Sequence, residues 1–302
     1  RQRQMCIRDS YETYFFNYIP RLDRLTEILA EYNQSVSKSK QFDITFIQPM
    51  IHDYLLNPEH YQSLALRALK GEEVATNNHW DNFITLAIML EHVLEVYQQQ
   101  QLTLDIFHQT ISDIFLRFNQ SNPSGITSDD FPWLMQIFKF RIFKLGELQF
   151  EFTHFRPETL PQNTVFRPDF SDYLIPKDPI ISVHIMEGSR IHPNQIRHEF
   201  DLAREFKARY FPELTIHYFY CYSWLLYPNN AQFMAPTSNI LAFMRLFEII
   251  AQANWPNMSI ERIFGDAYIE AIDQPLPQQT SLQKAASQHL DQLGVGVGVI
   301  AY

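Results

Sequence analysis

The residues best suited to chemistry stand at the end of a short apolar strand predicted at 180–185. His184 lies in this strand, and Glu187 follows three residues later. Either side chain could take a proton from a substrate that enters where the strand ends splay apart. The alternative for His184 is a hydrogen-bonded core residue, which is the commoner role of a histidine inside a strand.

The loop after this strand could hold an anion. Residues 187–192 lead into a helix predicted to begin at Pro193, because proline suits the first helical position. The first amides of a helix have no partner within it and therefore attract phosphate groups. A glycine would let the backbone approach the ligand, and arginines would add charge. The candidate contacts are Gly188, Ser189, Arg190 and Arg197. The alternative is an ordinary connection with solvated arginines.

A second polar group falls on a long strand predicted at 215–226. A period of two places Cys221 and Ser223 on one face, with Tyr222 and Trp224 on the other. Ser223 could donate a hydrogen bond to a reacting group, and Trp224 could contact the substrate. Cys221 would act as a nucleophile only with a lowered pKa and a basic neighbour. The alternative for the whole strand is core packing.

Ser238 and Asn239 precede a helix predicted at 239–251. Ser238 suits the N-cap of this helix, a role worth ~1 kcal/mol. Both residues could also hold polar groups of a substrate. Arg245 could bind an acidic group there or form a plain surface ion pair.

The elements that must position these residues change character near residue 140. Up to residue 136, apolar side chains recur every three or four positions, which predicts five or six helices. Two of the stripes lie at 22–29 and 83–97, and Thr103 could cap a third helix. After residue 138 the period becomes two, which predicts a pair of strands around Gly146.

Strands and helices then alternate to the end of the chain. We expect a Pro-rich surface connection, then strands and helices in an α/β order with a mixed sheet. The further predicted elements are a helix from 193 to 210, a strand at 260–264, a helix at 282–293 and a strand at 295–302. The predicted fold class is therefore α+β, with an all-helical domain at 11–138 and a mixed-sheet α/β domain at 139–302.

Composition excludes several classes of function. The 302 residues carry 24 Lys and Arg against 34 Asp and Glu, a net charge of −10. Nucleic acids and anionic membranes attract basic surfaces, so we expect neither as a partner. Two cysteines cannot build a disulfide framework or a thiolate zinc site, so we expect no metal and a cytoplasmic location. Eight glycines make a Gly-rich nucleotide-binding fold improbable.

The first ten residues, RQRQMCIRDS, do not begin with Met and do not continue the pattern that follows. They resemble translated adapter DNA, so we treat residues 1–10 as an artefact, the alternative being a disordered tail. They contain no apolar core of a signal peptide, and no uninterrupted membrane span of ~20 apolar residues occurs in the chain.

Three segments of the second half carry a family resemblance: VHIMEG at 183–188, CYSWLL at 221–226 and TSNILAF at 237–243. They resemble the marks of a bacterial acyltransferase family that pairs a helical N-terminal domain with a GNAT-like C-terminal domain. LGELQF at 145–150 is similar to the family's strand at the domain junction. The sequence departs from the family where Met186 replaces a proline and where Gly188 stands alone. The general GNAT pattern for pyrophosphate binding is also absent.

The resemblance implies acyl transfer from acetyl-CoA or another acyl-CoA to an amine or a similar small molecule. For this reaction the residues themselves suggest catalytic roles for His184, Glu187 and Ser223, and CoA contacts from the loop and its arginines. Substrate contacts would come from four residues: Trp224, Ser238, Asn239 and Arg245. A non-catalytic CoA-binding or ligand-binding module is the first alternative. A hydrolase using Ser223 or Cys221 is the second, although no Gly-x-Ser-x-Gly elbow is present. The sequence leaves the oligomeric state open.

Overall fold

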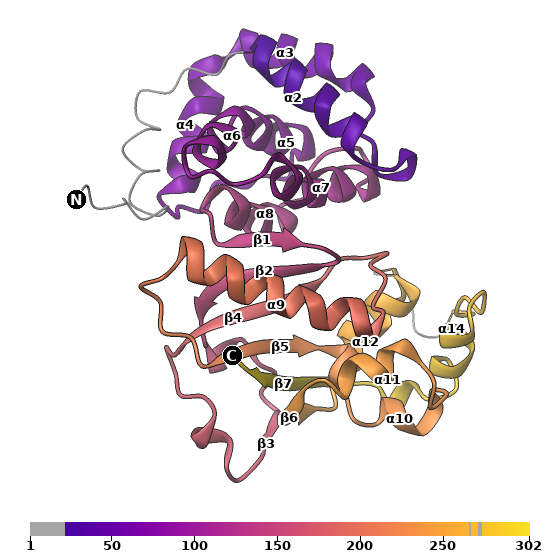
Figure 1. Cartoon of the computed structure of the whole chain (residues 1–302). Coiled ribbons are helices and arrows are strands. Elements are labelled where there is room, and N and C mark those ends of the chain that lie inside the picture. The colour runs from indigo at the N-terminus through magenta and orange to yellow at the C-terminus, as the bar shows by residue number, and fades with distance from the viewer. Residues whose placement is uncertain (1–21, 266, 271–273) are drawn as a thin grey trace. The chain divides into compact units, whose positions relative to one another are not determined.

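The computed structural model describes residues 22–265, 267–270 and 274–302 (Figure 1). The artefact proposed at 1–10 and the predicted start of the helical domain at residue 11 lie outside them. The chain divides into two compact units between Gln149 and Phe150. The domain boundary at 138/139 stays a prediction. None of the described helices is long and apolar enough to span a membrane.

From residue 22 to residue 138 the described chain forms helices and no strand, which confirms the predicted α+β class. The α-helices are α2 (Leu22–Ser35), α3 (Ile47–Leu56), α4 (Pro58–Leu69), α5 (His79–Ala87), α6 (Leu90–Gln99), α7 (Leu104–Gln120) and α8 (Asp130–Phe138). Two short 3-10 helices, η1 (Lys38–Lys40) and η2 (Ile44–Phe46), lie between α2 and α3. Thr103 caps α7 as predicted, because its side chain accepts from the amide of Ile106.

The predicted stripe at 83–97 is not one helix. It is divided between α5 and α6 by a turn at Ile88 and Met89. Both turn residues are buried, with exposed fractions of 2% and 1%. Because the turn is as apolar as the helices beside it, the hydrophobic pattern continues through the break and does not reveal it.

Aromatic side chains fill the core of this helical unit. The rings of Phe83 and Phe118 lie 4.4 Å apart between centroids, and Phe42 lies 5.5 and 5.2 Å from them. Tilted and edge-on ring pairs add ~0.5–1.5 kcal/mol each to the burial of their surface. Phenylalanines therefore hold α5 and α7 together with the segment that follows α2.

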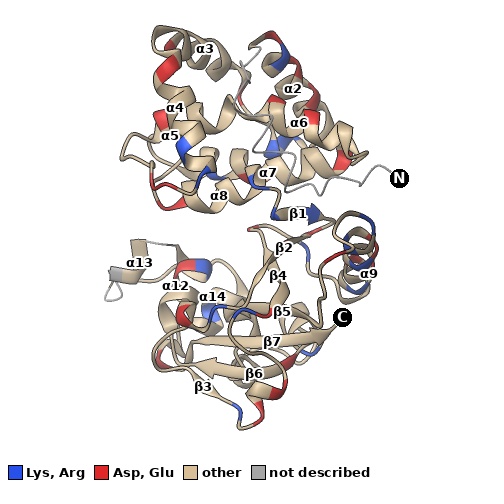
Figure 2. Ribbon diagram, turned by 90° about the vertical axis from the view of Figure 1, so that its left-hand side faces the viewer, with Lys and Arg blue, Asp and Glu red and all other residues tan. Residues whose placement is uncertain are grey.

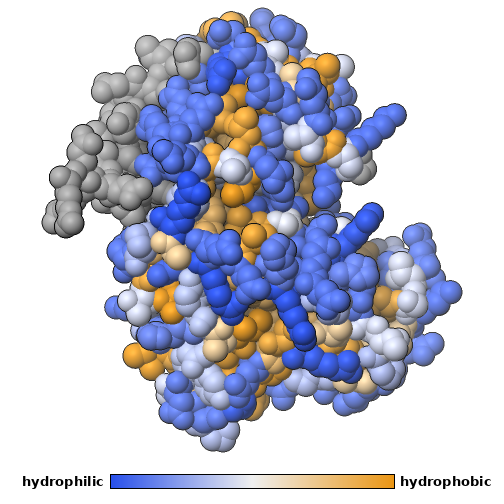
Figure 3. All heavy atoms as spheres, in the orientation of Figure 1, coloured by the Kyte–Doolittle hydropathy of each residue, from blue (hydrophilic) through white to orange (hydrophobic). Residues whose placement is uncertain are grey.

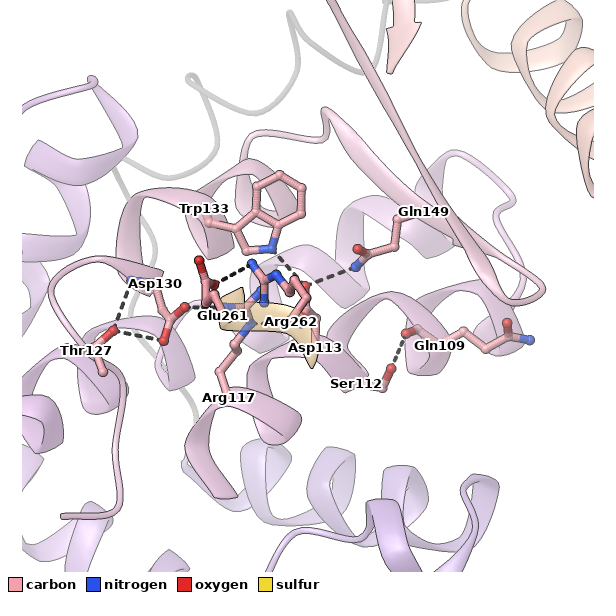
Figure 4. A network of polar contacts seen from close by, with 10 residues as sticks. All are labelled: Gln109, Ser112, Asp113, Arg117, Thr127, Asp130, Trp133, Gln149, Glu261 and Arg262. Atoms are coloured by element: carbon pink, nitrogen blue, oxygen red, sulfur yellow. Dashed lines mark hydrogen bonds and ion pairs between the residues drawn. The ribbon is translucent and has the colours of Figure 1, made fainter. Parts of the chain in front are cut away.

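A buried carboxylate connects α7, α8 and the start of β2 (Leu148–His154). Asp113 accepts hydrogen bonds from Trp133 Nε1 at 2.8 Å and Gln149 Nε2 at 3.0 Å, and pairs with Arg117 (Figure 4). Arg117 also pairs with Asp130. Burial lowers the pKa of Arg117, but the charges and hydrogen bonds of both aspartates outweigh it and raise this pKa above its ordinary value. The buried charges are therefore paired and hydrogen-bonded, as they must be to be tolerated in a core.

A seven-stranded mixed sheet follows, in the order β1-β2-β4-β5-β7-β6-β3. With β2, its strands are β1 (Ile142–Leu145), β3 (Val165–Phe166), β4 (Pro179–Ile185), β5 (Tyr218–Ser223), β6 (Glu248–Ala253) and β7 (Val295–Ala301). The turn between β1 and β2 contains Gly146 at a φ of 82°, as the alternation predicted. β4 and β5 are parallel, whereas β5–β7, β6–β7 and β3–β6 are antiparallel.

The longest helix of the second unit, α9 (Pro193–Tyr210), packs on one face of the sheet. Phe200 lies 5.8 Å from Phe150 on β2 and 4.9 Å from Phe219 on β5, between ring centroids. Its outer residues carry charges of both signs (Figure 2), and the surface over it is mostly hydrophilic (Figure 3). The amphipathic pattern of the predicted helix is confirmed.

The Pro-rich connection between β2 and β4 contributes to the core. Phe155, Leu160 and Leu174 are buried in one cluster with Tyr220 of β5 and neighbouring residues of β6 and β7. The segment contains only the short helices η3 (Pro157–Thr159) and η4 (Phe170–Asp172) and the strand β3. The buried apolar side chains are spread along this segment. They help to cover the sheet, although the segment itself forms no long helix.

Three predicted elements of the second unit are wrong. The helix predicted at 239–251 ends at Met244 as α11 (Asn239–Met244), and β6 follows because antiparallel pairing with β7 buries Ile250 and Ala251. The strand predicted at 260–264 is the end of α12 (Pro256–Phe264), whose buried side chains have helical spacing. The helix predicted at 282–293 is two short pieces, α14 (Ser281–Ala286) and η6 (Leu290–Gln292).

The remaining short helices are α10 (Asn230–Phe233), α13 (Ala267–Glu270) and η5 (Trp224–Leu226).

The alternating glycines of β7 have a packing role. A Cβ on Gly296 would lie 2.2 Å from the carbonyl oxygen of Leu226 and 2.6 Å from its carbonyl carbon. A Cβ on Gly298 would lie 2.7 Å from the Cβ of Phe247. These glycines therefore allow η5 and the segment before β6 to lie directly on the strand.

We expect Gly296→Ala to destabilise the second unit by ~3 kcal/mol or more, the upper part of the range for overpacking a core. The added methyl group meets backbone atoms, which cannot turn away as a side chain does. Gly298→Ala is the matched comparison and should cost less, since its neighbours are side-chain atoms. Urea midpoints followed by circular dichroism test the order. Equal midpoints for Gly296→Ala and the unsubstituted protein would contradict it.

Candidate functional site

The parallel strands β4 and β5 are paired over the middle of their length. Among the described residues their register pairs are Ile181 with Phe219 and Ser182 with Tyr220. β5 remains paired with β7 as far as Ser223. The last residues of β4, 183–185, thus extend past the ladder that joins the two strands. These residues lead directly into the loop before α9 (Pro193–Tyr210).

The loop after β4 forms a tight turn directly before α9. The amide of Ser189 donates to the carbonyl of Met186 at 3.2 Å, and Gly188 has a positive φ of 77°. Glycine adopts this backbone conformation without steric cost. A Cβ on Gly188 would have no neighbour within 4 Å, so the space beside it is open.

The N-terminus of α9 has the features of an anion site. Pro193 is the first helical residue, and the helical ladder starts with the bond from the amide of Ile196 to the carbonyl of His192, at 2.9 Å. The amides of Asn194 and Gln195 have no acceptor within the helix. The side chain of His192 does not cap it, and its first turn contains no acidic residue. Arg190 and Arg197 are exposed beside this end, as is Glu187.

His184 forms a hydrogen-bonded pair with a residue that sequence reasoning did not single out. Its Nε2 lies 2.9 Å from Oε2 of Glu151 on β2. The side chain of His184 is 30% exposed, and that of Glu151 is 12% exposed. His184 is therefore a half-buried histidine facing a carboxylate at the end of β4. This geometry is compatible both with a proton acceptor and with a hydrogen-bonded structural residue.

The polar residues of β5 are buried. Ser223 is 9% exposed, and its Oγ accepts from the amide of Leu225 at 3.2 Å at the start of η5. Cys221 is fully buried, and burial raises the pKa of its thiol. A thiol with a raised pKa is a poor nucleophile at neutral pH. This opposes the hydrolase alternative that would use Cys221.

Trp224 does not lie on β5. The strand ends at Ser223, and Trp224 begins η5, where it packs against a cluster around Ile260, Ile263 and Phe264 of α12. The predicted strand to residue 226 is therefore too long by three residues. Its alternation holds within β5, since Tyr222 packs with Tyr220 on the face opposite Phe219.

Ser238 is the N-cap of α11, as predicted. Its side chain accepts from the amide of Ile240 at 3.2 Å. Asn239 is exposed in the first turn. Arg245 follows the last residue of α11, and its Nη1 donates to the carbonyl of Pro236 at 3.3 Å. Arg245 therefore joins the end of α11 to the loop before that helix, and its role toward a substrate stays a prediction.

The candidates gather around the C-terminal ends of two neighbouring strands. His184 and the loop 187–192 are at the end of β4, and Ser223 is at the end of β5. α11, which carries Ser238 and Asn239, packs against both η5 and α9. The sequence signal for Glu151 was an acidic residue between Phe150 and Phe152 on an alternating strand, but only the strand order shows that it reaches His184.

Comparisons with known proteins identify the family and the fold. Residues 142–300 match the family model described as the GNAT-like C-terminal domain. An acyltransferase crystallised with decanoyl-CoA and teicoplanin superposes with a TM-score of 0.67 at 17% identity, covering 94% of this chain and 89% of the other. An acyltransferase variant crystallised with octanoyl-CoA gives a TM-score of 0.64 at 16% identity, with the same coverage. A search of curated proteins finds no significant match. At identities this low, the structural likeness shows only that the folds are similar.

Proposed function

The chain belongs to the family with a GNAT-like C-terminal domain, and we propose that it transfers an acyl group from an acyl-CoA to an amine or a similar small nucleophile. The observation that carries this proposal is the end of the β4–β5 ladder at Ser182, shortly before the loop that leads into the N-terminus of α9. A pantetheine arm would lie along the last residues of β4, and the pyrophosphate would follow at the helix. The structural neighbours crystallised with CoA, octanoyl-CoA and decanoyl-CoA support the same assignment.

The CoA pyrophosphate would lie at the N-terminus of α9. The amides of Asn194 and Gln195 supply donors, and Arg190 and Arg197 supply positive charge. The space beside Gly188 lets the phosphates approach the backbone. This arrangement does not need the general GNAT motif, which the sequence lacks.

His184 would accept the proton of the incoming ammonium group. The free amine then attacks the thioester carbonyl and the carbon–sulfur bond breaks. The CoA thiolate takes up the proton from His184, and the second proton that the nitrogen loses as the amide forms is released to water. The products are the acylated amine and free CoA. Glu187 is exposed in the turn and Ser223 already accepts a bond from its own chain, so both are weaker candidates for the proton transfer.

A change at the two arginines tests the cofactor site. We expect Arg190→Ala with Arg197→Ala to weaken CoA binding about tenfold or more, since a hydrogen bond to a charged group contributes ~1.5–3 kcal/mol. Titration calorimetry with CoA measures the effect. Arg209→Ala, at the opposite end of α9, is the matched control and should leave the Kd unchanged. An unchanged Kd in the double variant would place the phosphate site elsewhere.

The reaction class is tested by binding and turnover together. Purified protein is screened by thermal shift with CoA, acetyl-CoA, octanoyl-CoA and decanoyl-CoA. A ligand at 100 times its Kd stabilises by ~2.7 kcal/mol. Thiol release and mass spectrometry with a panel of amines then detect transfer. Binding without transfer to any amine would favour the non-catalytic module, and no binding at all would refute the proposal.

A further inference from the structure

We infer that Glu151 is the positioning residue of His184 and that it selects the ring nitrogen which accepts the substrate proton. The inference rests on the proposed acyl transfer, and no sequence motif points to it. It begins from one contact, the 2.9 Å hydrogen bond between Nε2 of His184 and Oε2 of Glu151.

The strands that carry the two residues hold this contact firmly. Glu151 lies on β2 and His184 on β4, and these strands are neighbours in the sheet. Phe150 and Phe152, on either side of Glu151, are 0% and 7% exposed. Phe152 stacks on Phe211, just after α9, with 4.3 Å between ring centroids. Packing therefore fixes the backbone of Glu151, and a rigid partner orients a side chain more closely than a loop residue does.

The chemistry of the pair determines the tautomer. An ionised carboxylate only accepts hydrogen bonds, so Nε2 of the neutral imidazole carries the hydrogen and donates it to Glu151. The lone pair is then on Nδ1. In the proposed reaction the ammonium N–H bond breaks and an Nδ1–H bond forms, which leaves an imidazolium beside the carboxylate. The negative charge of Glu151 stabilises this cation until the proton passes to the CoA thiolate.

Exposure supports a role in proton transfer over a role in stability alone. Glu151 is 12% exposed, so its charge is only weakly screened by water, whereas His184 is 30% exposed and accessible to a substrate. A bond that only joined two strands would need neither the carboxylate charge nor a particular tautomer. Removing the charge while keeping the size of the side chain therefore separates the two roles.

The test uses the full chain labelled with nitrogen-15 and the substitution Glu151→Gln. Ring nitrogen shifts report the tautomer of His184, whose signals are those that His184→Gln removes. We expect a single Nε2–H tautomer in the unsubstituted protein and a mixture in Glu151→Gln, because an amide both donates and accepts. We also expect kcat to fall at least about tenfold, which is less than the ~10²–10⁴-fold contribution of the acid–base group itself, with KM for the acyl-CoA unchanged.

Matched variants keep the test decisive. Glu158→Gln removes the same charge at an exposed position of η3 and should change neither readout. Should Glu151→Gln fail to fold, Glu151→Asp is measured in its place. It keeps the charge but shortens the side chain, so we expect the same mixture of tautomers and the same fall in kcat. A folded Glu151→Gln protein with the original tautomer or full kcat overturns the inference while leaving acyl transfer intact. If the unsubstituted protein transfers no acyl group, the proposed function fails, and the tautomer alone then decides the positioning role.

Discussion

The substitution His184→Gln is expected to lower kcat for acyl transfer by ~10²–10⁴-fold, the usual contribution of a positioned general base. Glutamine keeps much of the size of histidine and a polar group that can reach Glu151, so the fold should survive. It has no group that accepts a proton near neutral pH. The loss should therefore appear in kcat, with KM for the acyl-CoA nearly unchanged, in steady-state assays of thiol release.

The control for this substitution is His217→Gln, which changes an exposed histidine just before β5. It should leave kcat unchanged. A folded His184→Gln protein with normal turnover would remove His184 from the mechanism. An unfolded one would show that the core reading of this histidine was right.

The sequence was sufficient to predict those elements whose structure depends on residues close to one another in the chain. Alternation predicted β1 and β2, a short apolar run predicted β4, and proline at the first helical position predicted the start of α9. Thr103 and Ser238 were identified as caps, because a capping bond is made within three residues of the chain. Each of these signals depends on neighbouring residues alone.

The errors fall where distant pairing decides the structure. Residues 248–253 form a strand because β7 pairs with them, although their sequence continues the apolar pattern of the helix before them. Gly296 of β7 is explained by the backbone of Leu226, about 70 residues earlier in the chain, and Gly298 by Phe247. None of these contacts leaves a local signal.

The candidate site shows the same division. His184 and the loop before α9 were identified from residue types at the end of a strand. Glu151 was not, because it lies 33 residues before His184 and joins it only through the order of strands in the sheet. Arg245 was a candidate by charge alone, and its bond to Pro236 shows a local structural role.

The second large effect concerns stability. We expect Asp113→Ala to destabilise the helical unit by about 3 kcal/mol, the lower end of the ~3–5 kcal/mol that follows from breaking a buried ion pair on one side. The side chain of Asp113 is 2% exposed, and its loss leaves the Trp133 indole and the Gln149 amide without the acceptor that now satisfies them. Arg117 keeps its pair with Asp130, which limits the loss.

Asp105→Ala is the matched control, because it makes the same change on the same helix at an exposed position of the first turn. Its cost should stay near ~0.3–1 kcal/mol, the value of one favourable charge at a helix N-terminus. Asp113→Asn should fall between the two, since its amide can accept one bond but presents donors to the others. Urea unfolding of the three variants measures the order. Equal midpoints for Asp113→Ala and Asp105→Ala would mean that water replaces the lost acceptor, and that the carboxylate contributes little to holding α7, α8 and the start of β2 together.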